Sequence, residues 1–153
     1  MNGWRCIATW VGLAVGLSIV PSGSHAASVV LITTEEARLA PARQLASSRG
    51  IFRAPRIEVG EQLSGPVHSP IHFKLIFRAF GGSSIDPGSV SVTYLKSTDV
   101  DLTPRIRPFL TSGGIEIPEA EVPPGNHVIK VSVHDSDGRE GTTQFSLTVN
   151  PAD

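Results

Sequence analysis

A strict period of two near the C-terminus constrains the fold of this chain more than any other feature. From Gly125 to Gly138, side chains suited to a protein core alternate with mostly polar ones, which is typical of a strand with one buried face. The turn residues Asp135-Ser136-Asp137-Gly138 close this strand, because Asp and Gly tolerate the left-handed backbone of tight hairpins. A second alternating stretch follows from Thr143 to Val149. The sequence therefore predicts a β-hairpin whose buried face carries His127, Ile129, Val131, Val133, Phe145, Leu147 and Val149.

Shorter alternating stretches upstream predict more strands of the same kind. They lie at 57–59, 73–77 and 90–94, with Phe73, Leu75, Phe77, Val90, Val92 and Tyr94 on their buried faces. Clusters of Pro, Gly and Ser separate them, and no long helical pattern interrupts them. Short strands with frequent turns indicate an antiparallel β-sandwich. Strand assignments between Ser97 and Glu121 stay open at this stage.

The run Pro-Pro-Gly-x-His-x-Ile-x-Val-x-Val-x-Asp-x-x-Gly from Pro123 to Gly138, with the strand that follows it, resembles the last hairpin of bacterial immunoglobulin-like domains. The resemblance covers about a quarter of the mature chain closely. It implies an immunoglobulin-like β-sandwich over 55–150 and carries no activity with it. It also implies that His127, near the start of its strand, forms a corner contact with upstream backbone.

The N-terminus has the layout of a secretory signal peptide. Arg5 supplies a positive start, an apolar stretch runs from Cys6 to Val20, and a Pro/Gly/Ser break follows. Ser24 and Ala26 place small residues at the positions that signal peptidase reads, so cleavage after Ala26 is expected. An uncleaved anchor is the alternative, but the apolar stretch is shorter than the roughly 20 residues that a spanning helix needs. We therefore predict a signal peptide over 1–26 and a periplasmic or secreted mature protein.

Signal removal changes what the mature chain can do. Both tryptophans, the single methionine and the single cysteine lie before Ala27, so no disulfide can stabilise the mature fold. Removing Arg5 leaves 12 basic against 14 acidic side chains. This near balance indicates neither a nucleic-acid partner nor stable membrane insertion after cleavage.

We predict that residues 27–54 form a flexible arm and that residues 151–153 form a short tail. The arm contains an apolar run at 29–32 and a possible helix of one or two turns that begins near Thr34. Five arginines and no acid lie between Ala37 and Ile57, spaced among small residues: Arg38, Arg43, Arg49, Arg53 and Arg56. A solvated linker is the favoured interpretation, and a basic tether for an acidic surface is the alternative.

Candidate catalytic and metal-binding residues have simpler structural explanations. His68 and His72 are four apart, but Pro70 between them disfavours the helix that would bring their rings together. Asp135, Asp137 and Glu140 resemble part of a calcium loop, yet a hairpin turn requires the same Asp and Gly residues. No nucleophile elbow occurs, and the mature chain has no cysteine. We expect no catalytic residue, no metal and no cofactor.

A partner-binding site is predicted at Arg105, Arg107 and Phe109. In an extended backbone these alternate residues would face one side, where two guanidinium groups beside an aromatic ring suit a carboxylate-bearing partner. The alternative is an edge strand that Pro104, Pro108 and the charges protect from added strands.

Two functions from different classes remain open. The first is a non-catalytic, exported binding or assembly module of the bacterial envelope, with an envelope protein as its partner. The second is an accessory domain that presents carbohydrate or another substrate to a separate enzyme. The second would need exposed aromatic rings for stacking on sugars, and the mature chain holds one Tyr and six Phe, several at inward-facing positions.

The predicted processing gives a direct test. Intact-mass measurement of the exported protein should place its N-terminus at Ala27, and the protein should show no tryptophan fluorescence because Trp4 and Trp10 leave with the signal. A mature species that retains either tryptophan would contradict the prediction.

Overall fold

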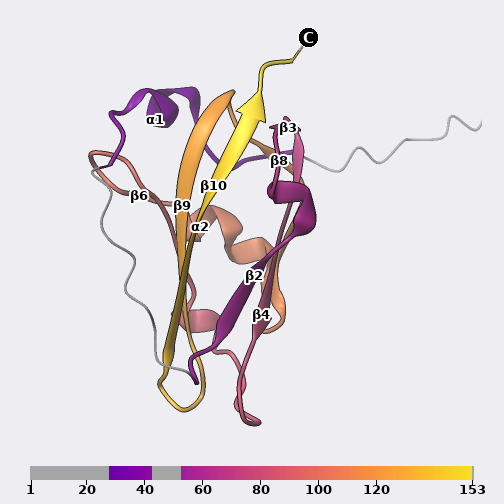
Figure 1. Ribbon diagram of the computed structural model, residues 1–153, viewed down its shortest axis with the longest axis vertical. Helices are drawn as coiled ribbons and strands as arrows, with labels where there is room; N and C mark the ends of the chain where they lie inside the picture. Colours follow the sequence, from indigo (N-terminus) through magenta and orange to yellow (C-terminus); the bar gives the residue numbers. More distant parts are fainter. Residues whose placement is uncertain (1–27, 43–52, 153) are drawn as a thin grey trace, which may run out of the picture.

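The computed structural model describes residues 28–42 and 53–152 of the 153-residue chain. The predicted signal peptide, Ala27 and residues 43–52 of the predicted arm, and Asp153 lie outside these ranges. The described chain forms two β-sheets that face each other, with their strands along the long axis of the molecule (Figure 1). The all-β, two-sheet architecture predicted from the sequence is confirmed.

The first sheet has the strand order β1-β8-β4-β2, and β7 also pairs with β8. Its strands are β1 (Val29–Val30), β2 (Arg56–Val59), β4 (Ile71–Arg78), β7 (Leu110–Thr111) and β8 (Gly114–Glu121). The second sheet has the order β3-β10-β9-β5-β6. Its strands are β3 (Val67–His68), β5 (Ser91–Tyr94), β6 (Val100–Asp101), β9 (Gly125–His134) and β10 (Glu140–Asn150).

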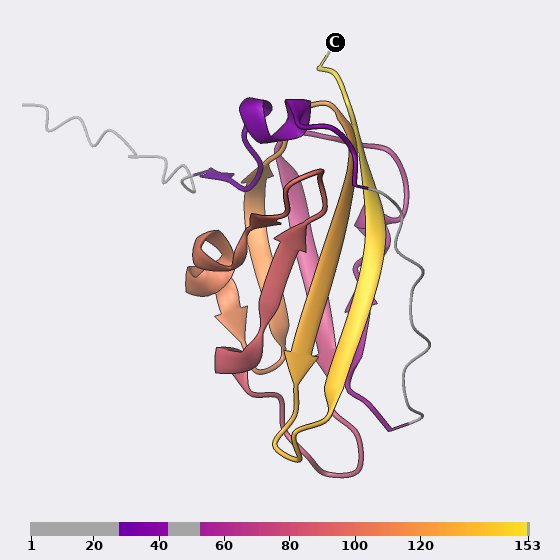
Figure 2. The same cartoon turned by 90° about the vertical axis from the view of Figure 1, so that its left-hand side faces the viewer.

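Short helical segments connect and flank these strands. They are α1 (Thr34–Arg38), α2 (Thr103–Ile106) and the 3-10 turns η1 (Glu61–Leu63), η2 (Pro87–Ser89) and η3 (Arg107–Phe109). α1 lies at the same end of the sandwich as the C-terminal residues, and the β9–β10 turn lies at the opposite end (Figures 1 and 2). No helix in the described ranges is long and apolar enough to cross a membrane.

The predicted hairpin is β9 and β10, paired from His134 with Glu140 to Gly125 with Val149. Its turn is closed by the Gly138 amide, which donates to the Asp135 carbonyl at 2.9 Å, with Gly138 at φ 74°. Because a side chain makes this backbone region costly, the glycine at this place is required by the turn. The alternation also holds: β9 buries His127, Ile129, Val131 and Val133 completely or nearly so.

The core lies between the two sheets. Phe73, Leu75 and Phe77 from β4 meet Val92 and Tyr94 from β5 and the buried face of β9. Phe73 also contacts Phe145 of β10 with ring centroids 6.3 Å apart. All of these residues were predicted to face inward, because the period of two fixes the face of each strand.

β8 is a long strand that the alternation does not reveal. Pro118 interrupts its pattern, and Pro118 and Glu119 are both exposed. The pairing with β4 explains this: Ile71 lies opposite Ala120 and Phe73 opposite Ile117, so β8 has one extra residue between these pairs. Such a bulge accommodates a proline that a regular ladder would exclude.

Two edge pairings differ from a purely antiparallel sandwich. β1 runs parallel to the end of β8, and β3 runs parallel to the end of β10. The first of these corrects the prediction of a flexible arm over 27–54 for residues 28–42. Leu31 and Ile32 are buried in the core, and α1 begins with Thr33 as its N-cap. The short helix near Thr34 is confirmed.

Two adjacent substitutions with very different expected effects test which face of β9 is buried. Val131→Asp should destabilise strongly, by several kcal/mol, because it places an unpaired carboxylate in the core. Lys130→Asp should change the free energy of unfolding by no more than about 0.5 kcal/mol, because Lys130 is exposed. Thermal and denaturant melts of both variants measure the difference, and equal effects would contradict the assignment.

Candidate functional site

The three residues predicted to form a partner-binding site do not lie on an extended strand. Residues 103–109 are helical, in α2 and η3, and not extended. Pro104 and Pro108 lie within the first turns of these segments, where proline is tolerated because the missing N–H would have no helical partner. Alternate residues therefore do not share one side, and the premise of the predicted site is wrong.

Each of the three side chains has a different environment. Arg105 contacts the N-terminal segment, Arg107 is exposed, and Phe109 is half-buried against the core. Phe109 also borders a small hollow of about 130 Å³ beside Lys74, Ile76 and Glu116.

Arg105 fixes the N-terminal segment through three hydrogen bonds. Its Nη1 donates to the Leu31 carbonyl at 2.8 Å and to Glu36 Oε2 at 2.9 Å, and its Nη2 donates to Glu36 Oε1 at 2.7 Å. The Glu36 side chain is 18 % exposed and that of Arg105 31 % exposed. A paired, forked contact of this kind is among the stronger ion pairs in proteins.

Glu36 also completes the cap of α1. Its Oε2 accepts from the Thr33 N–H at 2.8 Å, while the Glu36 N–H donates to Thr33 Oγ1. The hydrogen bonds from Arg105 lower the pKa of Glu36 from 4.5 to about 2, with Thr33 adding to the shift and burial opposing it. The carboxylate therefore stays charged down to strongly acidic pH, and the contact between α1 and α2 persists with it.

Lys96 holds the end of the same segment. Its Nζ donates to the Ala37 carbonyl at 2.8 Å and lies 5.1 Å from the centre of the Tyr94 ring. The Ser97 N–H donates to the Ala40 carbonyl at 2.7 Å, next to a bridge between Pro41 and Lys96. Residues 28–42 are thus held at both ends by cationic side chains from the second sheet and its connections.

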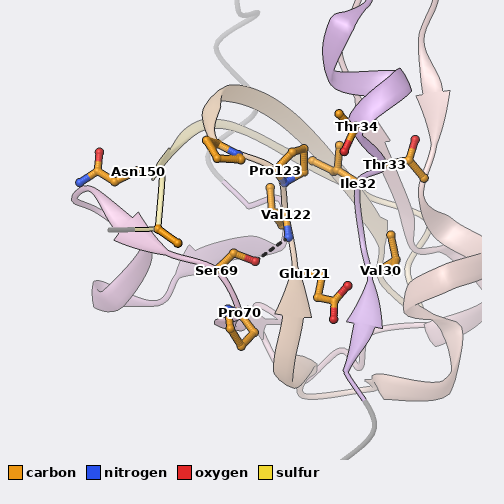
Figure 3. A pocket seen from close by; sticks show the side chains of 12 residues that line it. Val30, Ile32, Thr33, Thr34, Ser69, Pro70, Glu121, Val122, Pro123 and Asn150 are labelled. Atoms are coloured by element: carbon orange, nitrogen blue, oxygen red, sulfur yellow. Dashed lines mark hydrogen bonds between the residues drawn. The ribbon is translucent and has the colours of Figure 1, made fainter.

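The fixed N-terminal segment forms one wall of a groove. The groove has a volume of about 610 Å³ and lies between β1, the start of α1, the end of β8, the Ser69–Pro70 segment and the end of β10 (Figure 3). Its lining comprises Val30, Ile32, Thr33, Thr34, Ser69, Pro70, Glu121, Val122, Pro123, Pro124, Asn150 and Ala152. Such a volume is within the range of about 300–1,000 Å³ found for ligand sites.

The chemistry of the groove is mainly apolar. Glu121 is the one ionisable side chain among its lining residues, and Val30, at 47 % exposure, is its most exposed large apolar residue. Ser69 Oγ accepts from the Val122 N–H at 3.1 Å, which fixes the floor (Figure 3). The remaining polar groups are the hydroxyls of Thr33 and Thr34 and the amide of Asn150. This arrangement can bind an apolar segment and orient it with a few hydrogen bonds.

His127 contacts the Pro123–Pro124 segment, which forms the wall of the groove opposite β1. Its Nε2 lies 2.8 Å from the Pro123 carbonyl oxygen, and its Nδ1 lies 2.8 Å from the Tyr94 hydroxyl. A carbonyl only accepts, so Nε2 carries the proton and Nδ1 accepts from Tyr94. This contact with upstream backbone confirms the corner contact expected of His127.

Burial sets the charge state of His127. Burial lowers the pKa of this imidazole below 6.5, and the positive charge of Lys96 lowers it further, although the hydrogen bond to Pro123 opposes the shift. The ring is therefore neutral at pH 7, held between two hydrogen bonds and 1 % exposed. Its position makes it a cross-link between strands.

The Asp135 carboxylate, in the acidic turn of the hairpin, is engaged by protein donors and is not free to bind a cation. This side chain accepts from the N–H groups of Asp137 and Arg139, from Arg139 Nε at 2.8 Å and from Ser83 Oγ. Burial alone would raise the pKa of Asp135, but these hydrogen bonds outweigh it and lower the pKa. Asp135 connects the β9–β10 turn to the loop before β5, as a turn residue.

The remaining candidate residues lie apart. His72 contacts Glu116 at 3.0 Å on the outer face of the first sheet, where Lys74 contacts the same carboxylate, and His68 is exposed at the end of β3. Within residues 28–42 and 53–152, no three His, Cys, Asp or Glu side chains are placed to hold a metal ion together.

Comparison with known proteins gives no functional assignment. No protein-family model matches the chain, and no curated protein matches it either.

The pH dependence of stability tests the neutral state of His127. Because its pKa is lower in the folded than in the unfolded protein, the unfolded chain binds the extra proton first, at about pH 6.5. The free energy of unfolding should therefore decrease as the pH falls below 6.5 and level off below the folded pKa. Denaturant melts between pH 7 and 5 measure this loss.

The His127→Gln variant should lose much of this slope. His68→Gln, at an exposed histidine remote from the Tyr94 pair, provides the matched control. An equal reduction of the slope in both variants would contradict the assignment to His127.

Proposed function

We propose that the mature protein is a non-catalytic, exported binding or assembly module of the bacterial envelope, with an immunoglobulin-like β-sandwich fold. The groove at the α1 end binds an extended, largely apolar segment of a partner protein. The signal-peptide pattern supports export, and the hairpin with its His127 corner supports the immunoglobulin-like topology. The groove itself is the observation that carries the binding function.

Side-chain chemistry supports a binding role over a catalytic one. The buried ionisable groups are engaged in contacts that hold the fold: Glu36 with Arg105, Asp135 with Arg139, and His127 with Tyr94. The groove lining contains one carboxylate and no imidazole. General acid–base catalysis most often uses a histidine held at the reacting atoms, and the lining has none, so binding fits this lining better.

The choice of an apolar protein segment as occupant follows from the same lining. Val30 and the three prolines offer aliphatic surface, whereas sugar binding commonly uses exposed aromatic rings. Among the described residues, the aromatic ring that is largely exposed is Phe80, and Phe80 lies in the loop after β4, remote from the groove lining. The carbohydrate-presenting alternative therefore has less support.

Site-specific photo-crosslinking tests the groove. A photoreactive amino acid at Val30 should give a covalent adduct with one defined envelope protein in intact cells, whereas the same residue at Phe80 should not. Val30 and Phe80 are similarly exposed, so they form a matched pair. Equal adducts at both positions, or an adduct with sugar polymer in place of protein, would contradict the proposal.

Binding of the identified partner to purified variants completes this test. Val30→Asp should reduce affinity at least tenfold, because an unpaired carboxylate would be desolvated in an apolar contact. Phe80→Asp should bind like the parent protein. Both substitutions are at exposed positions, so melting temperatures should change little.

A further inference from the structure

One carboxylate in the groove has no cationic partner among residues 28–42 and 53–152. Three carboxylates in these ranges are buried or half-buried: Glu36, Asp135 and Glu121. Glu36 and Asp135 each pair with an arginine. Glu121 accepts a hydrogen bond from the neutral Ser28 hydroxyl at 2.5 Å and forms no ion pair with any lysine, arginine or histidine of the described chain. Its charge is therefore not compensated there.

The pairing of β1 with β8 fixes Glu121 beside the apolar part of the groove. The Glu121 carbonyl accepts from the Leu31 N–H at 2.9 Å, and Val30 lies opposite Glu121 in the register of the two strands. The side chains of Val30 and Glu121 both line the groove (Figure 3). Because paired strands lie about 4.8 Å apart, a ligand that contacts Val30 also lies beside Glu121.

A wholly apolar occupant would remove water from this carboxylate and put nothing in its place. An unpaired charge is among the most costly groups to desolvate. The groove lining cannot offset this cost, because it contains no lysine, arginine or histidine. An occupant that places a cation at Glu121 avoids the cost and gains a charge-assisted hydrogen bond.

We propose that the groove selects a partner segment in which a lysine or arginine lies within two residues of an aliphatic side chain. The cation pairs with Glu121, and the aliphatic side chain contacts Val30. In an extended segment, side chains on one side are two residues apart, which suits two neighbouring contacts of this kind. Glu121 thereby rejects segments that are wholly apolar or acidic at this position. This inference rests on the proposed function and defines the chemistry of the bound segment.

Selection from a phage-displayed library of random nine-residue peptides tests this chemistry. The target is the protein expressed from its complete coding sequence. The Val30→Asn variant, which loses the aliphatic contact without a change of charge, identifies peptides that bind elsewhere. Peptides that depend on Val30 should be enriched in lysine or arginine at one position, with aliphatic residues beside it. With the Glu121→Lys variant as target, that position should change to aspartate or glutamate.

Affinities of synthetic peptides from the enriched set measure the ion pair. Replacing the cationic residue of the peptide with glutamine should weaken binding about tenfold or more. Glu121→Gln should weaken binding similarly and remove the difference between the two peptides, because both changes delete one interaction. Glutamine still offers an oxygen to the Ser28 hydroxyl, so the melting temperature should change little. The matched control is Glu119→Gln, at an exposed glutamate of β8 outside the groove lining, which should bind as the parent does.

The role of Glu121 and the proposed function fail in different ways. Val30-dependent peptides that lack a cation, or an affinity that survives Glu121→Gln, would overturn the role of Glu121 while the groove stands as a binding site. If no peptide is enriched, or if every selected peptide binds the Val30→Asn variant as tightly as the parent, the groove is not the binding site and both proposals are overturned.

Discussion

The contact between Arg105 and Glu36 decides where the first part of the described chain lies. The guanidinium group binds both oxygens of the carboxylate and the Leu31 carbonyl, so it fixes α1 and the end of β1 at once. Burial of Leu31 and Ile32 adds apolar contact beneath this ion pair. Replacing Arg105 with an acidic residue would set two carboxylates against each other, so this position serves the fold before any partner. The groove depends on the same contact, since β1 and the start of α1 form one of its walls.

The opposite wall depends on a second buried interaction. His127 connects β9 to Tyr94 of β5 and to the Pro123 carbonyl. Because both ring nitrogens are used in fixed roles, protonation would break the hydrogen bond from Tyr94. The hydrogen bond from Nε2 to the Pro123 carbonyl, which holds the proline segment, is made in both protonation states. Two polar contacts, one charged and one neutral, thus define the two sides of the groove.

The sequence predicts the parts of this fold that depend on local alternation. The β9–β10 hairpin, β2, β4 and β5 are all visible in the period of two, because one face of each is buried. β8 is hidden by the bulge at Pro118, and the alternate spacing of Arg105, Arg107 and Phe109 predicts an extended backbone where the chain forms α2 and η3. The Arg105–Glu36 contact joins residues 69 apart, and no local pattern reports such a pairing. The groove could not be predicted for the same reason, since its lining comes from β1, β8, β10 and the loop before β4.

Residues 28–42 show how a weak local signal can be outweighed by tertiary contacts. Their arginine-rich continuation and small residues indicated a solvated linker, yet a short apolar run and one capping box are enough to anchor them. The only cysteine, Cys6, precedes the predicted cleavage site, so a disulfide cannot hold this segment in the processed chain. Hydrogen bonds from Arg105 and Lys96 hold it instead. The low pKa of Glu36 extends this anchoring to acidic pH: the stabilisation is fully present above pH 4.5 and is lost only as the pH falls toward about 2.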